Sequence, residues 1–234
     1  MKSQNRQKEA PGKGRGVFIT FEGIEGSGKT TQMKRVENDL QKEGVPVVRT
    51  REPGGTRIGE GVRGILLDPE NHEMASLSEL LLYEACRTQL VHQVIRPGLR
   101  RAAVILCDRF ADATVAYQGY GRGLDLDRIA VLNRMAMDGA EPDLTLLLDC
   151  PVDLGLHRVR GRLGDAAGPE TLDRLEAEDL AFHERVRQGY LTLAQENPDR
   201  FRVVNTVRDA DAVHREILGH VSGLLAEREI HAVR

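Results

Sequence analysis

The sequence contains few cysteines, no excess of basic residues and no long apolar run. Only Cys86, Cys107 and Cys150 occur among 234 residues, and no two of them show metal-ligand spacing. An odd number of cysteines beside apolar residues is typical of buried free thiols, so we expect a reducing compartment, the cytoplasm. The formal net charge of −3 disfavours a nucleic-acid partner bound by electrostatic attraction. The apolar runs are too short to cross a bilayer, so we expect no membrane partner.

The N-terminal residues differ in composition from the rest of the chain. Residues 1–15 are polar and basic and lack the apolar core of a signal peptide. Because they can bury little apolar surface, we expect a disordered tail, with a basic arm for a polyanion as the alternative. The length of the remainder favours a single domain over residues 16–234.

Short apolar runs alternate with helical patterns along that domain. The predicted strands are 16–22, 46–50, 102–108, 144–150 and 201–205. The predicted helices are 30–44, 57–67, 75–96, 126–139, 153–163, 171–196 and 209–227, with Pro97-Gly98 ending the third. Continuous apolar strands separated by helices predict an α/β fold, a five-stranded parallel sheet flanked by helices.

The segment GIEGSGKT follows the first strand and opens the first helix. It fits the phosphate-binding loop pattern of the P-loop NTPase fold, in which glycines turn backbone N–H groups toward phosphate oxygens. Lys29 would reach the outer phosphates, and the Thr30 hydroxyl would bind Mg²⁺. The residues expected to contact ATP here are Gly23, Ile24, Glu25, Gly26, Ser27, Gly28, Lys29, Thr30 and Thr31.

Signatures of regulatory GTPases and motor ATPases are weak or missing. The guanine-reading Asn-Lys-x-Asp is missing, and the Asp-x-x-Gly match at 165–168 follows no strand. The third strand instead ends in Asp108-Arg109. Asp108 can hold Mg²⁺ or its waters while Arg109 holds an acceptor phosphate, with a surface salt bridge as the alternative for Arg109. This favours a small-molecule kinase, and a non-catalytic nucleotide-binding switch protein stays open.

Several further motifs make the chain resemble the thymidylate kinases, especially the bacterial form. They are FEGIEGSGKTTQ (21–32), REPGGT (51–56), LLYEACRTQL (81–90), DRFADATVAYQGYGRG (108–123), PDLTLLLD (142–149) and DRLE (173–176). The resemblance runs from about residue 17 to the C-terminus. It implies transfer of the ATP γ-phosphate to dTMP with Mg²⁺, in a homodimer. A kinase for another nucleoside monophosphate or small acceptor is the alternative.

The acceptor site is expected around the long helix and the segment after Arg109. Tyr83 and Arg87 are four residues apart and share a helix face, which suits stacking on a base and donation to its carbonyl. A cation–π pair on a solvated face is the alternative. The resemblance implies the base-binding role for both, and places Thr114 at the base edge and Tyr117 against the deoxyribose.

Two further residues complete the expected acceptor pocket. Gln118 is expected to line the same pocket as Tyr117. Arg51, directly after the second strand, is assigned to the acceptor phosphate, with a structural salt bridge as the alternative.

The phosphate loop contains no arginine, so the charge for phosphoryl transfer must come from elsewhere. Residues 157–174 supply several arginines and are expected to form a small mobile lid. In a helix, Arg158 and Arg162 share a face. Arg162 would neutralise the transferred phosphoryl group and Arg158 would lie over the adenine, the alternative being a solvated charged face. The resemblance is to the thymidylate kinases with a lid-borne arginine.

Two remaining site residues follow from position and resemblance. Glu25 is an acid inside a loop built for anions, and the resemblance assigns it to the 3′-hydroxyl of the acceptor sugar. The adenine is expected to meet backbone near Asn205, after the last strand. The expected catalytic set is therefore Lys29, Arg109, Arg162 and Glu25.

Overall fold

A computed structural model describes residues 15–101, 103–163 and 172–230, without the side chains of Arg162 and Leu163. Its centre is a parallel five-stranded sheet in the order β2-β3-β1-β4-β5. The strands are β1 (Val17–Glu22), β2 (Val47–Arg51), β3 (Val104–Asp108), β4 (Leu144–Asp149) and β5 (Phe201–Asn205). Each boundary lies within two residues of its predicted position, and the α/β prediction is confirmed.

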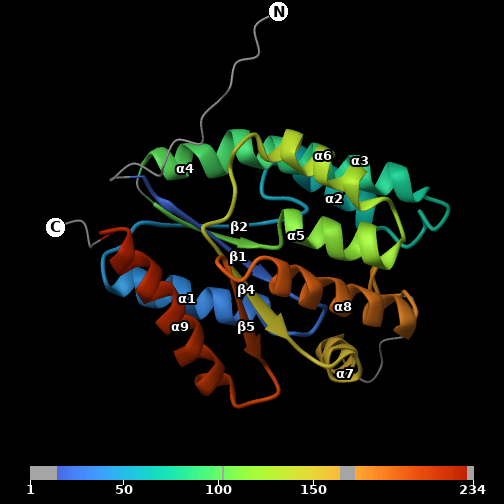
Figure 1. Ribbon diagram of the computed structural model, residues 1–234. Coiled ribbons are helices and arrows are strands. Elements are labelled where there is room, and N and C mark those ends of the chain that lie inside the picture. The colour runs from blue at the N-terminus through green and yellow to red at the C-terminus, as the bar shows by residue number, and fades with distance from the viewer. Residues whose placement is uncertain (1–14, 102, 164–171, 231–234) are drawn as a thin grey trace, which may run out of the picture.

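Helices cover both faces of this sheet (Figure 1). The α-helices are α1 (Lys29–Lys42), α2 (Arg57–Leu67), α3 (Ser76–Leu90), α4 (Arg96–Arg100), α5 (Ala111–Thr114), α6 (Leu126–Met137), α7 (Val152–Leu163), α8 (Leu180–Glu196) and α9 (Ala210–Glu227). Two π-helical segments, η1 (Val91–Ile95) and η2 (Val115–Gly121), continue α3 and α5. In the described part of the chain, no helix is long and apolar enough to span a membrane.

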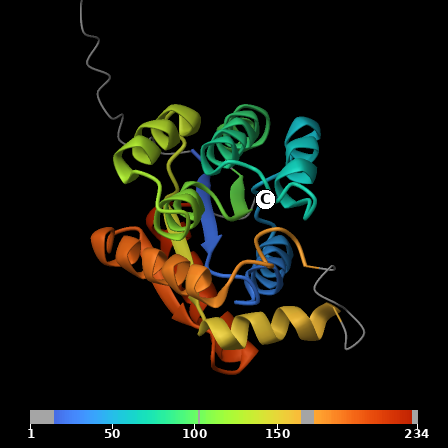
Figure 2. The same ribbon diagram turned by 90° about the vertical axis from the view of Figure 1, so that its right-hand side faces the viewer.

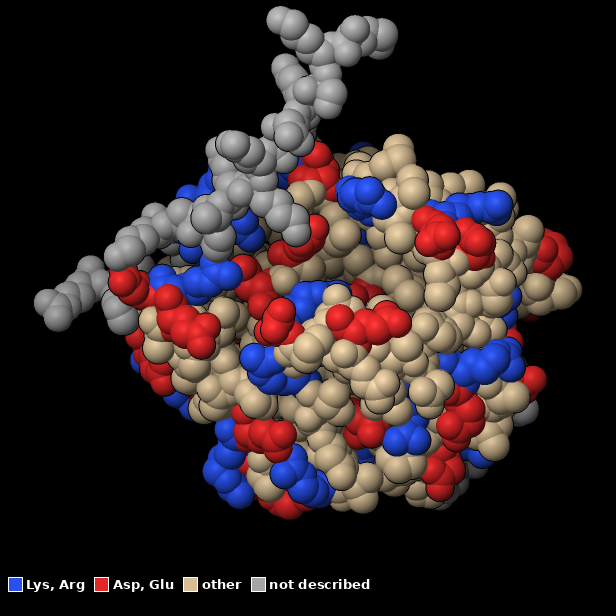
Figure 3. Space-filling view, in the orientation of Figure 1, with Lys and Arg blue, Asp and Glu red and all other residues tan. Residues whose placement is uncertain are grey.

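The alternation of side chains along β1 explains the layered architecture. Val17, Ile19 and Phe21 pack in one cluster with residues of α1 and α9, whereas Phe18 packs in another with residues of η1 and α4. Successive side chains of a strand point to opposite faces, so β1, which is buried along its whole length, requires cover on both sides. The charged groups of the surface are interspersed by sign on the face seen in Figure 3.

The helix predicted to end at Pro97-Gly98 continues to Arg100, so that boundary was wrong. Pro97 lies in the first turn of α4, after the π segment, where a missing N–H costs little. Gly98 has a packing role instead, because a Cβ there would lie 2.3 Å from Cδ1 of Ile105. The glycine lets α4 approach β3 closely.

The helix predicted over 171–196 begins only at Leu180. Asp173 accepts hydrogen bonds from the N–H groups of Leu175 and Glu176, which closes a turn. The buried Arg174 is held by the Leu66 carbonyl at 2.9 Å and by Glu79 at 2.5 Å. These contacts keep the segment out of helical conformation until Asp179 caps α8.

Candidate active site

The phosphate loop joins β1 to α1 and is tightly packed. Gly26 has φ +69, and a Cβ there would lie 2.0 Å from the Gly155 carbonyl oxygen, so only glycine fits. Lys29 is buried, with Nζ 3.0 Å and 2.8 Å from the carbonyl oxygens of Gly23 and Ile24. Burial, followed by the charge of Arg109, lowers the pKa of the Lys29 ammonium to about 8. The Lys29 ammonium therefore lies inside the phosphate loop, bound by two of the loop's carbonyl oxygens.

A cavity of about 950 Å³ extends from this loop along the carboxyl ends of β1, β2 and β3. Most residues predicted for the site line it: Glu25, Gly26, Ser27, Gly28, Lys29, Thr30, Thr31, Arg51, Tyr83, Arg87, Asp108, Arg109, Thr114, Tyr117, Gln118 and Arg158. Gly23, Ile24 and Asn205 do not line it. The side chain of Arg162 lies outside the described residues.

Parallel register explains why segments distant in the sequence meet here. Arg51, the last residue of β2, pairs with Asp108, the last residue of β3. The carboxyl ends of parallel strands form one edge, which is where open α/β sheets bind ligands. The Thr30 hydroxyl donates to Oδ2 of Asp108 at 2.7 Å, so the first turn of α1 reaches the same edge.

Arg109 follows β3 with its backbone in the left-handed region, at φ 68. Its Nη2 lies 2.8 Å from Oε1 of Glu25, and its guanidinium lies 4.7 Å from the centre of the Tyr117 ring. The Tyr117 hydroxyl donates to the same Glu25 oxygen at 2.6 Å. Arg109 is therefore part of the cavity wall and not a surface ion pair.

The Glu25 carboxylate is stabilised in its charged form. Burial alone would raise its pKa, but Arg109, the ring of His183, Lys29 and Tyr117 together hold the pKa well below its usual range. Nδ1 of the fully buried His183 lies 3.5 Å from the second carboxylate oxygen. Glu25 thus faces Arg109 and Tyr117, on the side of the cavity predicted for the acceptor.

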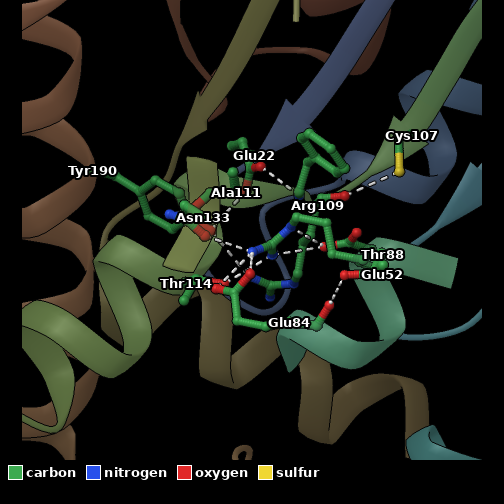
Figure 4. A network of polar contacts seen from close by, with 12 residues as sticks. Glu22, Glu52, Glu84, Thr88, Cys107, Arg109, Ala111, Thr114, Asn133 and Tyr190 are labelled. Carbon is green, nitrogen blue, oxygen red and sulfur yellow. Dashed lines mark hydrogen bonds and ion pairs between the residues drawn. The ribbon is translucent and has the colours of Figure 1, made fainter. Parts of the chain in front are cut away.

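Figure 4 shows a buried polar network that includes Glu52, Glu84, Thr114 and Asn133, and Arg87 donates to all four. Its Nε and Nη2 donate to Oε2 of Glu52 at 3.1 and 2.7 Å, and Nη2 also donates to the Thr114 hydroxyl at 2.8 Å. Its Nη1 donates to Glu84 at 3.0 Å and to Asn133 at 2.5 Å. All five guanidinium N–H groups therefore have partners.

This environment excludes the solvated-face alternative for Tyr83 and Arg87. Both residues are buried, and the guanidinium of Arg87 lies over the ring of Phe110, 5.2 Å from its centre. Burial, opposed by the charge of Arg87, raises the pKa of Glu52 to about 7. Glu52, Glu84 and Asn133 were not predicted as site residues. Glu52 and Glu84 lie inside the motifs REPGGT and LLYEACRTQL, whereas Asn133 carried no sequence signal.

Next to the phosphate loop, the cavity continues between α7 and the end of β5. Arg158 donates from Nη1 to the Gly26 carbonyl at 3.4 Å and from Nη2 to the Thr206 carbonyl at 3.1 Å. Asn205 is exposed, and its side chain accepts from the Val207 N–H at 2.9 Å. Thr206 and Arg208, which follow it, line the cavity instead.

Two further predicted residues make salt bridges or hydrogen bonds at the cavity wall. Arg51 lines the cavity and donates from Nη2 to Oε2 of Glu60 at 2.8 Å, so the salt bridge given as its alternative role is present. Gln118 donates to Oε1 of the buried Glu79 at 2.8 Å. Both side chains are thus fixed by an acid that sequence analysis did not single out.

A phosphate loop at one end of a cavity, with buried polar and aromatic side chains at the other, defines a P-loop kinase with a small nucleotide-sized acceptor. The thymidylate kinase family model matches residues 21–217. The chain therefore belongs to the thymidylate kinase family.

Individual relatives agree with the family match over most of their length. The thymidylate kinase of Geotalea daltonii is 50% identical over 212 residues, which cover 89% of this chain and 99% of the relative. That of Geobacter sulfurreducens is 54% identical over 190 residues, covering 81% and 89%. A crystal structure of thymidylate kinase from Ehrlichia chaffeensis superposes with a TM-score of 0.69 at 38% identity, covering 89% of this chain and 99% of that one.

Proposed function

We propose that the enzyme transfers the γ-phosphoryl group of ATP to dTMP, giving dTDP and ADP, with Mg²⁺ as cofactor. One observation carries the proposal: a single cavity has the phosphate loop at one end and Tyr83, Arg87 and Thr114 at the other. Arg109 lies between them, where the phosphate of an acceptor would meet the donor. A membrane or nucleic-acid partner has no part in this function.

The chemistry assigned to the protein is charge neutralisation and positioning. The attacking oxygen of a monophosphate is already anionic, so no strong general base is needed. Lys29 neutralises the outer phosphates of ATP, and Arg109 neutralises the acceptor phosphate together with Arg51. Arg158, between the phosphate loop and Thr206, covers the adenine near the backbone that follows Asn205.

Mg²⁺ fits the residues present. Among the described residues, no group of three or more His, Cys, Asp or Glu side chains could hold a metal ion. Mg²⁺ in kinases, however, takes most of its ligands from water and substrate phosphates. The Thr30 hydroxyl and the Asp108 carboxylate, 2.7 Å apart, would hold it, and the bound ion would offset charge on the phosphates.

The acceptor pocket would distinguish base and sugar by separate groups. Tyr83 stacks on thymine, while Arg87 and Thr114 bind its polar edge, with Gln118 in the adjoining wall. Because the Thr114 hydroxyl accepts from Arg87, its own proton remains to donate to a ligand. Tyr117 packs against the deoxyribose, where it crowds a 2′-hydroxyl, and Glu25 binds the 3′-hydroxyl.

A coupled assay of ADP release with dTMP, dUMP, dCMP, UMP and AMP tests this function. We expect the highest kcat/KM with dTMP and a lower value with UMP than with dUMP. A preference for UMP or AMP would contradict the acceptor assignments. ATP binding without turnover of any monophosphate would instead indicate a nucleotide-binding switch protein.

The lid-borne arginine gives a separate prediction. We expect Arg162→Ala to lower kcat by at least about 10³-fold, because an arginine supplied to the transferred phosphoryl group contributes that much in related chemistry. The KM values for both nucleotides should change little. Arg160→Ala is the matched control, two residues away on α7 and exposed. A larger loss with Arg160→Ala would move the catalytic charge to that residue.

A homodimer is proposed from apolar side chains on neighbouring helices. Figures 1 and 2 show α2, α3 and α6 side by side. These helices expose Ile58, Ile65, Leu77, Leu81, Leu126, Val131 and Met135. Contiguous exposed apolar patches mark protein–protein interaction sites, and the proposal is that these side chains form one.

We expect Leu81→Asp combined with Met135→Asp to convert the dimer into a monomer, because two charges per protomer would be buried in the interface. Light scattering after size-exclusion chromatography measures the mass. Leu180→Asp is the control, since Leu180 is also exposed but begins α8, elsewhere on the chain. A mass that is unchanged by the double substitution would contradict this interface.

The proposed location is the cytoplasm. Cys86, Cys107 and Cys150 are all free and buried, which supports a reducing compartment. ATP and deoxynucleotides are also used there as substrates.

A further inference from the structure

We propose that Glu22 is a positioning residue for Arg109, acting through the Phe110 N–H and the Tyr190 hydroxyl. Neither Glu22 nor Tyr190 lines the cavity, so neither can touch a substrate directly. The inference rests on the proposed function, in which Arg109 holds the acceptor phosphate. The inference explains what holds the Arg109 guanidinium in a single position.

The first contact fixes the backbone of Arg109. Glu22 is the last residue of β1, and its Oε1 accepts from the Phe110 N–H at 2.7 Å. The N–H of Arg109 itself donates to the Phe21 carbonyl at 3.0 Å. The left-handed Arg109, at φ 68, is therefore bracketed by two hydrogen bonds to the end of β1. A non-glycine residue keeps such a conformation only where its surroundings determine it.

The second contact fixes the side chain. Tyr190, from α8, donates to Oε2 of Glu22 at 2.8 Å and accepts from Nη1 of Arg109 at 3.3 Å. The opposite amino group of Arg109 is held by Glu25 at 2.8 Å. Both ends of the planar guanidinium are thus fixed, and Figure 4 shows Glu22, Tyr190 and Arg109 close together.

The surroundings of Glu22 also argue against a role in packing alone. The side chain is fully buried, and burial, followed by repulsion from Asp112, raises its pKa to about 8. An apolar residue would fill this space without that penalty. Its two carboxyl oxygens are used for two specific contacts, and both lead to Arg109. Rigid support of this kind is what a phosphate-binding group needs.

Glu22→Leu, which fills the same space but accepts no hydrogen bond, and Tyr190→Phe test the proposal, singly and together. Tyr190→Phe keeps the ring that packs edge-on against Tyr117 and removes only the hydroxyl. We expect each variant to raise the KM and Kd for dTMP by about tenfold, roughly the effect of one hydrogen bond. The KM for ATP should change less than about twofold. Because both variants break one chain of contacts, the double variant should lose no more than the worse single variant.

Tyr120→Phe is the matched control, since it removes a hydroxyl from η2 that makes none of these contacts, and it should leave the KM for dTMP unchanged. An unchanged dTMP Kd in Tyr190→Phe, or equal weakening of dTMP and ATP with a lowered Tm, would overturn the proposal. If Glu22→Leu does not fold, Tyr190→Phe alone decides. If the wild type prefers another monophosphate, the proposed function fails, and the same comparison with that acceptor still decides the role of Glu22.

Discussion

Replacing Lys29 with methionine is expected to lower kcat for dTDP formation by about 10²- to 10³-fold. The ammonium lies within the phosphate loop, 2.8 Å from the Ile24 carbonyl, where the proposed function places the outer phosphates of ATP. Methionine keeps much of the apolar stem, so the loop should keep its shape while the charge is lost. The coupled ADP-release assay with saturating ATP and dTMP measures the change.

Lys42→Met is the control for this substitution. Lys42 lies at the other end of α1 and forms an exposed pair with Asp39, so its loss should leave kcat within about twofold. A decrease of less than about tenfold in Lys29→Met would contradict the assignment. In that case Arg109 and the proposed lid arginine, Arg162, would have to neutralise the phosphates without Lys29.

Replacing Arg87 with methionine is expected to lower the free energy of unfolding by about 3–5 kcal/mol. The substitution leaves the buried carboxylates of Glu52 and Glu84 without their cation. It also leaves Asn133 without the donor it now accepts from. Urea unfolding measures the loss. Arg35→Met, which removes an exposed hydrogen bond to the Ala210 carbonyl and the surface pair with Asp211, should cost less than about 1 kcal/mol.

The loss in Arg87→Met should depend on pH. In the wild type, burial raises the pKa of Glu52 to about 7 in the folded state, above its value in the unfolded chain. Glu52 therefore lowers stability progressively as the pH rises from about 4.5 to about 7. Without Arg87 the folded pKa of Glu52 rises further, so this decline extends to higher pH. We expect a larger loss at pH 8 than at pH 5.5. Equal losses at the two values would show that charge on Glu52 and Glu84 is not the cause.

The strands and the phosphate loop were predictable because their signals are local. A short, mostly apolar run such as residues 17–21 indicates a buried strand without knowledge of the rest of the fold. The glycine spacing then fixes the loop that follows. Residues at the ends of strands could also be assigned to one edge, because parallel strands share their direction. Arg51, Asp108 and Arg109 were found in this way.

The supports behind those residues could not be predicted, because each depends on long-range contacts. Glu22 and Tyr190 are 168 residues apart, and Arg87 meets Glu52 and Asn133 from separate segments. The two wrong helix boundaries have the same origin. Pro97-Gly98 looks like a local stop, and only the packing of Gly98 on Ile105 shows otherwise. Likewise, 172–179 is kept non-helical by contacts of Arg174 with α2 and α3.

Glu25 belongs to the loop proposed to hold ATP, yet its carboxylate contacts Arg109 and Tyr117, which are proposed to bind the acceptor. Under the proposed function, the two nucleotides therefore share one structural element. Any shift of Glu25 caused by dTMP changes the loop that ATP meets. Linkage then requires that ATP change the affinity for dTMP by the same factor as dTMP changes that for ATP. An inhibitor that binds the ATP half of the cavity should therefore change in affinity when dTMP is bound. An inhibitor that binds the acceptor half should change in affinity when ATP is bound.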